Sequence, residues 1–90
     1  MSQESTLCHI DGTDVAGSLS KLHESLSADA ELVLDFTHID RIDVPAVHSL
    51  ADLAVAADEA AARVTLRGLR VGVYKVLKLT GLSEHFSYLG

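Results

Sequence analysis

Short apolar runs alternate with amphipathic stretches along this chain. The first run, residues 6–10, is prone to β structure, and the next four residues, Asp11-Gly12-Thr13-Asp14, suit a turn and a helix N-cap. Apolar residues then recur every three or four positions, at Val15, Leu19, Leu22 and Leu26. This period places them on one side of a helix, so we predict a helix over residues 15–26 that packs on a sheet.

Residues 32–36 form a nearly continuous apolar run, which predicts a central strand covered on both faces. A connection over residues 37–42 follows it. Asp43 then stands where its carboxylate can accept backbone N–H bonds, and Pro45 fits the first turn of a helix. This second helix is predicted to continue to about residue 62, with one face formed by Val47, Leu50, Ala54, Ala57 and Ala61.

The last third of the chain predicts one more strand and helix and then a closing strand. Residues 63–67 alternate as a strand with one buried face, Gly68 marks its end, and a third helix spans residues 71–79. Gly81 lies where the end of a helix needs a left-handed residue. A last short strand is predicted to close the core with Leu82, Phe86, Tyr88 and Leu89.

These elements predict one α/β domain over residues 1–90, of which residues 1–5 are disordered. The order βαβαβαβ indicates a four-stranded, mostly parallel sheet with three helices and right-handed crossovers. The chain has 90 residues, 48% of them hydrophobic, which supplies one modest core and leaves no room for a second domain.

Charge is distributed unevenly along the chain. The net charge is −6, which argues against nucleic acid as a partner. Twelve of the thirteen acidic residues precede residue 63, whereas five of the seven basic residues lie at residue 63 or after it. These five either form a locally basic surface or balance acids elsewhere in the fold, and we favour the second interpretation. They are Arg63, Arg67, Arg70, Lys75 and Lys78.

The sequence predicts a cytoplasmic protein that does not insert into a membrane. Its single cysteine, Cys8, cannot pair within the chain and reads as a small buried hydrophobe, and the polar start has no signal-peptide character. The most apolar stretch, residues 44–57, is shorter than a membrane span and is interrupted by His48, Ser49 and Asp52.

Few residues suggest catalysis. His38 and His48 flank a loop with Asp40 and Asp43, which offers imidazole and carboxylate ligands for a metal, but the spacing matches no strong metal motif. The glycines are too sparse for a phosphate-binding loop. We therefore expect no enzymatic activity and no cofactor, and keep a metal-dependent enzyme using these residues as a third hypothesis.

Four segments, in this order, resemble the STAS family of sulfate-transporter and anti-sigma-factor-antagonist domains. They are the turn near Asp11, residues 33–43 (VLDFTHIDRID), the Ala-rich helix after it, and residues 64–69 (VTLRGL). The resemblance continues through Val73 and Leu77 to Phe86 and covers about residues 6–89. It implies a STAS-like fold and a bacterial regulatory module that binds other proteins.

The resemblance fails at one functional position. In anti-sigma-factor antagonists this loop ends in Asp-Ser-Ser-Gly, and a kinase phosphorylates a serine there to switch partner binding. The matching residues here are Asp43-Val44-Pro45-Ala46, so Pro45 stands at the phosphoacceptor position without a hydroxyl or an N–H. Asp43 is either a phosphate mimic or a helix cap, and we favour the cap. Thr37 and Ser49 are nearby hydroxyls that are open to modification instead.

The leading hypothesis is a non-catalytic, non-phosphorylatable regulatory module that binds an anti-sigma factor or a related kinase. Its predicted contact residues are Asp40, Arg41, Asp43, Val44, Pro45 and His48. The second hypothesis, also implied by the resemblance, is a STAS subunit that binds the ATPase of an ABC-type phospholipid transporter, with residues 73–79 among the similar segments.

Both ends of the chain depart from the family pattern. Five residues precede the first strand, where the family has an N-terminal hairpin, and the chain stops where a final helix would cover the sheet. Apolar surface left open in this way predicts self-association into a homodimer or binding of a partner.

Overall fold

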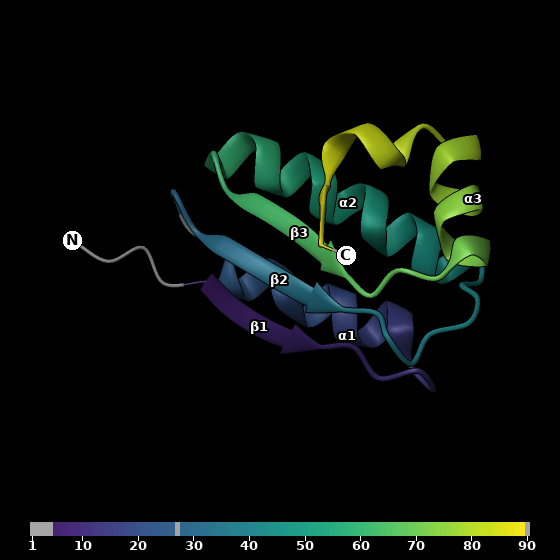
Figure 1. Ribbon diagram of the computed structural model, residues 1–90. Coiled ribbons are helices and arrows are strands. Elements are labelled where there is room, and N and C mark those ends of the chain that lie inside the picture. Colours follow the sequence, from purple (N-terminus) through teal and green to yellow (C-terminus); the bar gives the residue numbers. More distant parts are fainter. Residues whose placement is uncertain (1–4, 27, 90) are drawn as a thin grey trace.

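The computed structural model describes residues 5–26 and 28–89 (Figure 1). Of the tail that was predicted to be disordered, residues 1–4 lie outside the described residues, and Ser5 is the first residue of a strand. The helices and strands follow the predicted order. They are β1 (Ser5–His9), α1 (Val15–Leu22), β2 (Glu31–Asp35), α2 (Val44–Ala60), β3 (Arg63–Arg67), α3 (Val71–Leu79) and β4 (Ser87–Leu89), with 3₁₀ turns η1 (His23–Ser25) and η2 (Leu82–His85).

The four strands form one sheet in the order β1-β2-β3-β4, and each neighbouring pair runs parallel. A helix connects each strand to the next, as parallel neighbours require. In the register of the sheet Leu7 lies beside Val33, Val33 beside Thr65, and Thr65 beside Ser87. The predicted α/β fold with four strands and three helices is confirmed.

The helices cover one face of the sheet. Along β2, Leu32 and Leu34 are 2% and 0% exposed, whereas Val33 between them stays partly exposed. Figure 1 shows α1 behind β1 and β2. The prediction that β2 is covered on both faces is therefore wrong. Each connection has the same hand and leads to the next strand on the same side of the sheet. The helices in these connections therefore all lie on the same face.

Two helices end earlier than predicted. After Leu22 the chain tightens into η1, so α1 stops short of residue 26, although Leu26 still packs against the core. α2 stops at Ala60 because Ala61 adopts a left-handed conformation, with φ 55°, and the Ala62 amide bonds back to the Ala57 carbonyl at 2.8 Å. Ala61 is therefore exposed and not part of the inward face.

One hydrophobic core lies between the sheet and the helices. Its fully buried members come from every layer: Leu19 of α1, Leu34 of β2, Leu50 and Leu53 of α2, Leu66 of β3, and Val73 and Leu77 of α3, together with Phe36 and Ile39 of the connection after β2. Strand β3 also buries the small Thr65 between Val64 and Leu66, so its burial does not alternate as predicted.

The chain after α3 agrees with the prediction in part. Helix α3 has the predicted bounds, and Gly81 after it is left-handed, with φ 78°. Phe86 is buried, but Tyr88 and Leu89 of β4 are 39% and 52% exposed and do not close the core. The Tyr88 ring instead packs edge-on against Tyr74 of α3, at 5.6 Å between centroids, and its hydroxyl donates to the Ser83 carbonyl at 2.6 Å.

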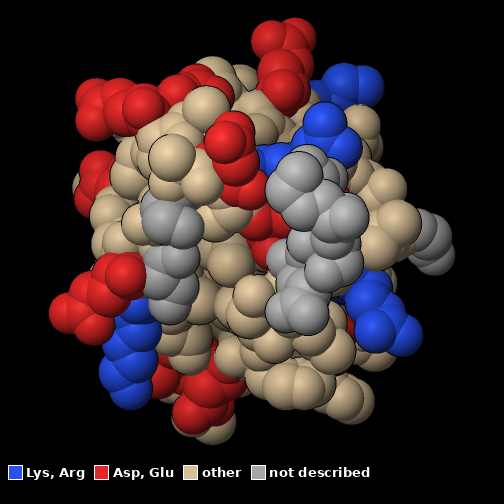
Figure 2. All heavy atoms as spheres, turned by 90° about the vertical axis from the view of Figure 1, so that its left-hand side faces the viewer, with Lys and Arg blue, Asp and Glu red and all other residues tan. Residues whose placement is uncertain are grey.

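The five basic residues of the last third do not gather in one patch. Arg63 and Arg67 lie at the two ends of β3, Arg70 pairs with Asp40 at 3.1 Å, and Lys75 and Lys78 lie on α3. Figure 2 looks at the end of the molecule where the strands begin, where more acidic than basic side chains are visible and both are scattered among uncharged residues. Within the described residues no helix is both long and apolar enough to cross a membrane.

Candidate functional site

Two loops meet at the end of the sheet where β1 and β2 stop. The loop after β1 leads into α1 and the loop after β2 leads into α2, and each helix begins with an aspartate cap. The Asp14 carboxylate accepts from the Gly17 amide, and the Asp43 carboxylate accepts from the Ala46 amide, both at 3.0 Å. The carboxyl ends of parallel strands are where α/β proteins commonly place their binding sites.

Asp43 therefore serves as a helix cap, as favoured from the sequence. Its backbone is extended, with φ −95° and ψ 178°, and its carbonyl accepts the first helical hydrogen bond, from Val47 at 3.0 Å. Caps of this kind stabilise a helix by about 1 kcal/mol. Pro45 fits because the first turn of a helix leaves its amides without helical partners.

The connection between β2 and α2 is held by buried side chains. Phe36 is fully buried and Ile39 is 2% exposed, and the Ile39 amide donates to the Phe36 carbonyl at 3.0 Å. The Phe36 amide donates in turn to the Arg67 carbonyl of β3 at 2.9 Å. These contacts fix the loop to the core, so the residues after Ile39 project from a rigid base.

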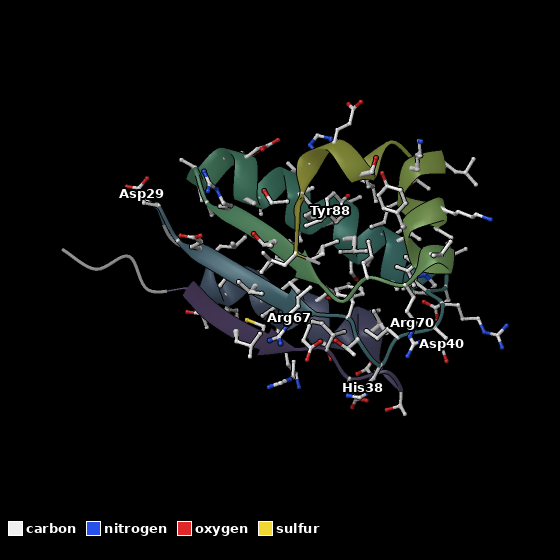
Figure 3. All side chains as sticks on the ribbon, viewed as in Figure 1. Asp29, His38, Asp40, Arg67, Arg70 and Tyr88 are labelled. Atoms are coloured by element: carbon white, nitrogen blue, oxygen red, sulfur yellow. The ribbon has the colours of Figure 1, made fainter. Side chains whose placement is uncertain are left out.

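The six predicted contact residues are all exposed and surround the start of α2. We call them the α2-start surface: Asp40, Arg41, Asp43, Val44, Pro45 and His48. Val44 is 67% exposed, which is unusual for a valine beside a core of this size. Arg70 ties Asp40 in place, because its Nε lies 3.1 Å from Asp40 Oδ1 and also donates to the Thr37 carbonyl at 3.1 Å (Figure 3).

A cleft joins this surface to the loop after β1. It has a volume of about 460 Å³ and is lined on one side by Arg41, Ile42, Asp43 and Pro45 and on the other by residues 12–16. The loops approach closely there, since a Cβ placed on Gly12 would lie 3.6 Å from the His38 carbonyl oxygen. Sequence analysis did not include residues 12–16 in the site. The parallel strand order was the one signal that pointed to them, because it brings the ends of β1 and β2 together.

The histidines and aspartates of the loop do not form a metal centre. Within residues 5–26 and 28–89 no three His, Cys, Asp or Glu side chains come close enough to hold a metal ion. The hypothesis of a metal-dependent enzyme built on His38 and His48 therefore has no support in the geometry. Cys8 is half-buried against the core, and this burial raises the pKa of its thiol, which disfavours the reactive thiolate.

The two alternative hydroxyls are both engaged. The Thr37 hydroxyl and amide both donate to Asp35 Oδ1. The Ser49 hydroxyl on α2 lies 3.5 Å from the Ser20 hydroxyl on α1. Both therefore have a structural explanation within the fold.

We predict that Thr37→Val raises the pKa of Asp35. The Thr37 hydroxyl is the main cause that lowers the pKa of this carboxyl, followed by the Thr37 amide, and burial opposes both. Because the folded-state pKa is lowered, ionised Asp35 stabilises the fold above its unfolded pKa, and this contribution is lost as pH falls through the folded pKa. Carbon-13 NMR titration of the carboxyl groups measures the change directly.

Asp11 supplies the internal control for that titration. Its pKa is lowered in the same way by the hydroxyl and amide of Thr13, on the other loop. The pKa of Asp11 should therefore stay constant in Thr37→Val. An unchanged Asp35 titration would show that the hydroxyl bond does not hold in solution.

Comparisons with known proteins address the fold and the family. The family described as "Mlab, STAS domain" matches residues 9–89. The crystal structure of a proposed anti-sigma factor antagonist from Thermotoga maritima is similar, with a TM-score of 0.67 and 15% sequence identity, over 98% of this chain and 74% of that chain. At this identity the similarity concerns the fold. No curated protein matches the chain in sequence.

The family match confirms the resemblance read from the sequence. It begins at the last residue of β1 and ends at the last residue of β4, so it includes both loops and the α2-start surface. The similar crystal structure supports the fold. The chain therefore belongs to the STAS domain family.

Proposed function

We propose that this chain is a non-catalytic interaction module that binds a partner protein through the α2-start surface. The observation that carries the proposal is the exposed apolar pair Val44 and Pro45, set beside the cleft and surrounded by charged residues. An apolar centre with a polar rim is typical of protein interfaces. The first partner class is an anti-sigma factor or a related kinase, in line with the fold shared with the proposed antagonist.

Binding at this surface is proposed to be constitutive. Neither Val44 nor Pro45 carries a hydroxyl, so no phosphate ester can form at these two positions. The α2 amide that a phosphate would approach is already occupied, because the Asp43 carboxylate accepts from Ala46. The position that is phosphorylated in the antagonists thus has no hydroxyl here, and the Ala46 amide beside it is already hydrogen-bonded.

The test is affinity capture from the native lysate with two matched variants of α2. Val44→Glu places a charge in the apolar centre of the surface, and Val55→Glu makes the same change on a valine that is 58% exposed further along the helix. We expect Val44→Glu to reduce partner recovery by at least about tenfold and Val55→Glu to leave it unchanged. Equal recovery with all three proteins would refute the proposed surface.

A second candidate function is a subunit that binds an ABC transporter ATPase. The observation in its favour is the exposed apolar surface of α3, where Val71 is 71% and Leu79 is 88% exposed beside Lys75 and Lys78. These residues lie in or beside the segment that resembles the transporter subunits. Loss of an ATPase partner in Leu79→Glu, with full recovery in Val44→Glu, would place this candidate first.

A further inference from the structure

Within residues 5–26 and 28–89, the helices all lie on one face of the sheet. β1, β2 and β3 turn alternate residues toward the helices, and the others lie on the opposite side, which we call the uncovered face. The Tyr74–Tyr88 contact places α3 on the helix side as well, because Tyr88 lies beside the buried Leu66. Parallel sheets are almost always covered on both faces, so the uncovered face of the described residues is a candidate binding surface.

Charges on the uncovered face are sorted by strand. β2 places Glu31 and Asp35 there, and β3 places Arg63 and Arg67 beside them in register. Midway along the two strands lie Val33, which is partly exposed, and Thr65, which is only 7% exposed. The face therefore carries an acidic stripe and a basic stripe side by side, about 4.8 Å apart. Within the chain the Asp35 carboxylate also accepts from Thr37 and lies 3.5 Å from His9 Nδ1 of β1.

This pattern is complementary to itself under one symmetry operation. A twofold axis parallel to the strands, between β2 and β3, lays the acidic stripe of one copy over the basic stripe of the other, with Glu31 opposite Arg63 and Asp35 opposite Arg67. A twofold axis across the strands would instead place Glu31 opposite Asp35 and Arg63 opposite Arg67. The charges therefore favour the first axis, which also gives the aligned packing common for stacked sheets.

Apolar residues accompany the charges. Val33 lies at the centre of the uncovered face, and Leu7 and Leu89 on the outer strands are 45% and 52% exposed. Three strands of five residues and one of three present roughly 300 Å² per copy, or about 600 Å² for a pair. This area is smaller than that of most stable interfaces, so the contact is weak and depends on concentration.

We propose that the uncovered face is a homodimer interface, in which two copies stack sheet on sheet about a twofold axis parallel to the strands. This surface lies on the opposite side of the sheet from the helices and is separate from the α2-start surface. The dimer leaves the start of α2 free, so one assembly presents two copies of the partner-binding surface.

Charge substitutions test both the interface and its symmetry. In the proposed dimer, position 31 of one copy faces position 63 of the other. Arg63→Glu makes both of these positions acidic, and Glu31→Lys makes both basic, so two copies of the same variant repel each other there. In a mixed dimer with one copy of each variant, each of these two contacts again joins an acidic and a basic side chain. We expect each variant alone to dimerise at least about tenfold more weakly than wild type and the mixture to recover to within about threefold.

Sedimentation velocity over about 10 µM to 1 mM measures the dimer, a range set by the small contact area. The matched controls are Glu59→Lys on α2 and Lys75→Glu on α3, which are exposed residues on the helix side of the sheet. Circular dichroism confirms that each variant is folded. A wild-type monomer at every concentration, a dimer unaffected by both stripe variants, or a mixture that stays monomeric would each overturn the proposal.

Discussion

Phe36→Ala is expected to lower the free energy of unfolding by about 3 to 5 kcal/mol. Phe36 is fully buried and is among the largest side chains of the core. Removal of its ring loses apolar burial and leaves a cavity beneath the connection to α2. A domain of this size has a total stability of about 5 to 13 kcal/mol, so the variant loses between about a quarter and all of it.

Urea denaturation followed by circular dichroism measures this loss, and Phe36→Leu is the matched control. Leucine keeps most of the buried volume, so its expected cost is less than about 2 kcal/mol. The alanine variant should also lower the thermal midpoint by about 12 °C or more. A loss below about 1 kcal/mol in Phe36→Ala would mean that this side chain does not hold the connection.

Gly68→Ala is expected to be far more destabilising than the same substitution at Gly81. Both glycines are left-handed, with φ 66° and 78°, so alanine is strained by about 1 kcal/mol at each position. At Gly68 a Cβ would also collide with the Thr37 hydroxyl oxygen and would lie 3.2 Å from the Thr37 Cα, whereas at Gly81 no atom lies within 4 Å. The collision adds about 1 to 3 kcal/mol.

Both variants carry the backbone strain, but only Gly68→Ala adds the collision. The difference between their losses of unfolding free energy therefore measures the collision. Chemical denaturation of both variants under the same conditions provides it. Thr37→Ala combined with Gly68→Ala removes the colliding hydroxyl and should recover part of the loss, because the backbone contact at Cα remains. Equal losses at Gly68 and Gly81 would show that the loops after β2 and β3 are not in close contact.

Local sequence signals predicted the elements whose limits are set locally. The bounds of α3 follow from Gly68, the apolar period and Gly81, and the start of α2 follows from Asp43 and Pro45. The end of α2 was missed because Ala61 takes a left-handed conformation for which alanine gives no signal. The early end of α1 likewise follows a change to 3₁₀ geometry that the spacing of Leu22 and Leu26 does not reveal.

The sequence alone could not predict features that depend on which distant segments come together. The run that contains Val33 reads the same whether one or both of its faces are covered, because strand order decides this. Residues 12–16 were not predicted to line the cleft for a similar reason, because they lie about thirty positions before the residues that face them. The start of α2 was predictable because Asp43 and Pro45 are local signals for a helix N-terminus, whereas the burial of Ala46 in the same turn depends on packing.

The strand order also has a consequence for how the chain is made. Each strand pairs with the strand that precedes it, at positions 26, 32 and 22 residues earlier for β2, β3 and β4. During synthesis, β1, α1 and β2 can assemble before α2 has been translated, and each later unit docks on a surface that already exists. The domain can therefore fold progressively as it leaves the ribosome.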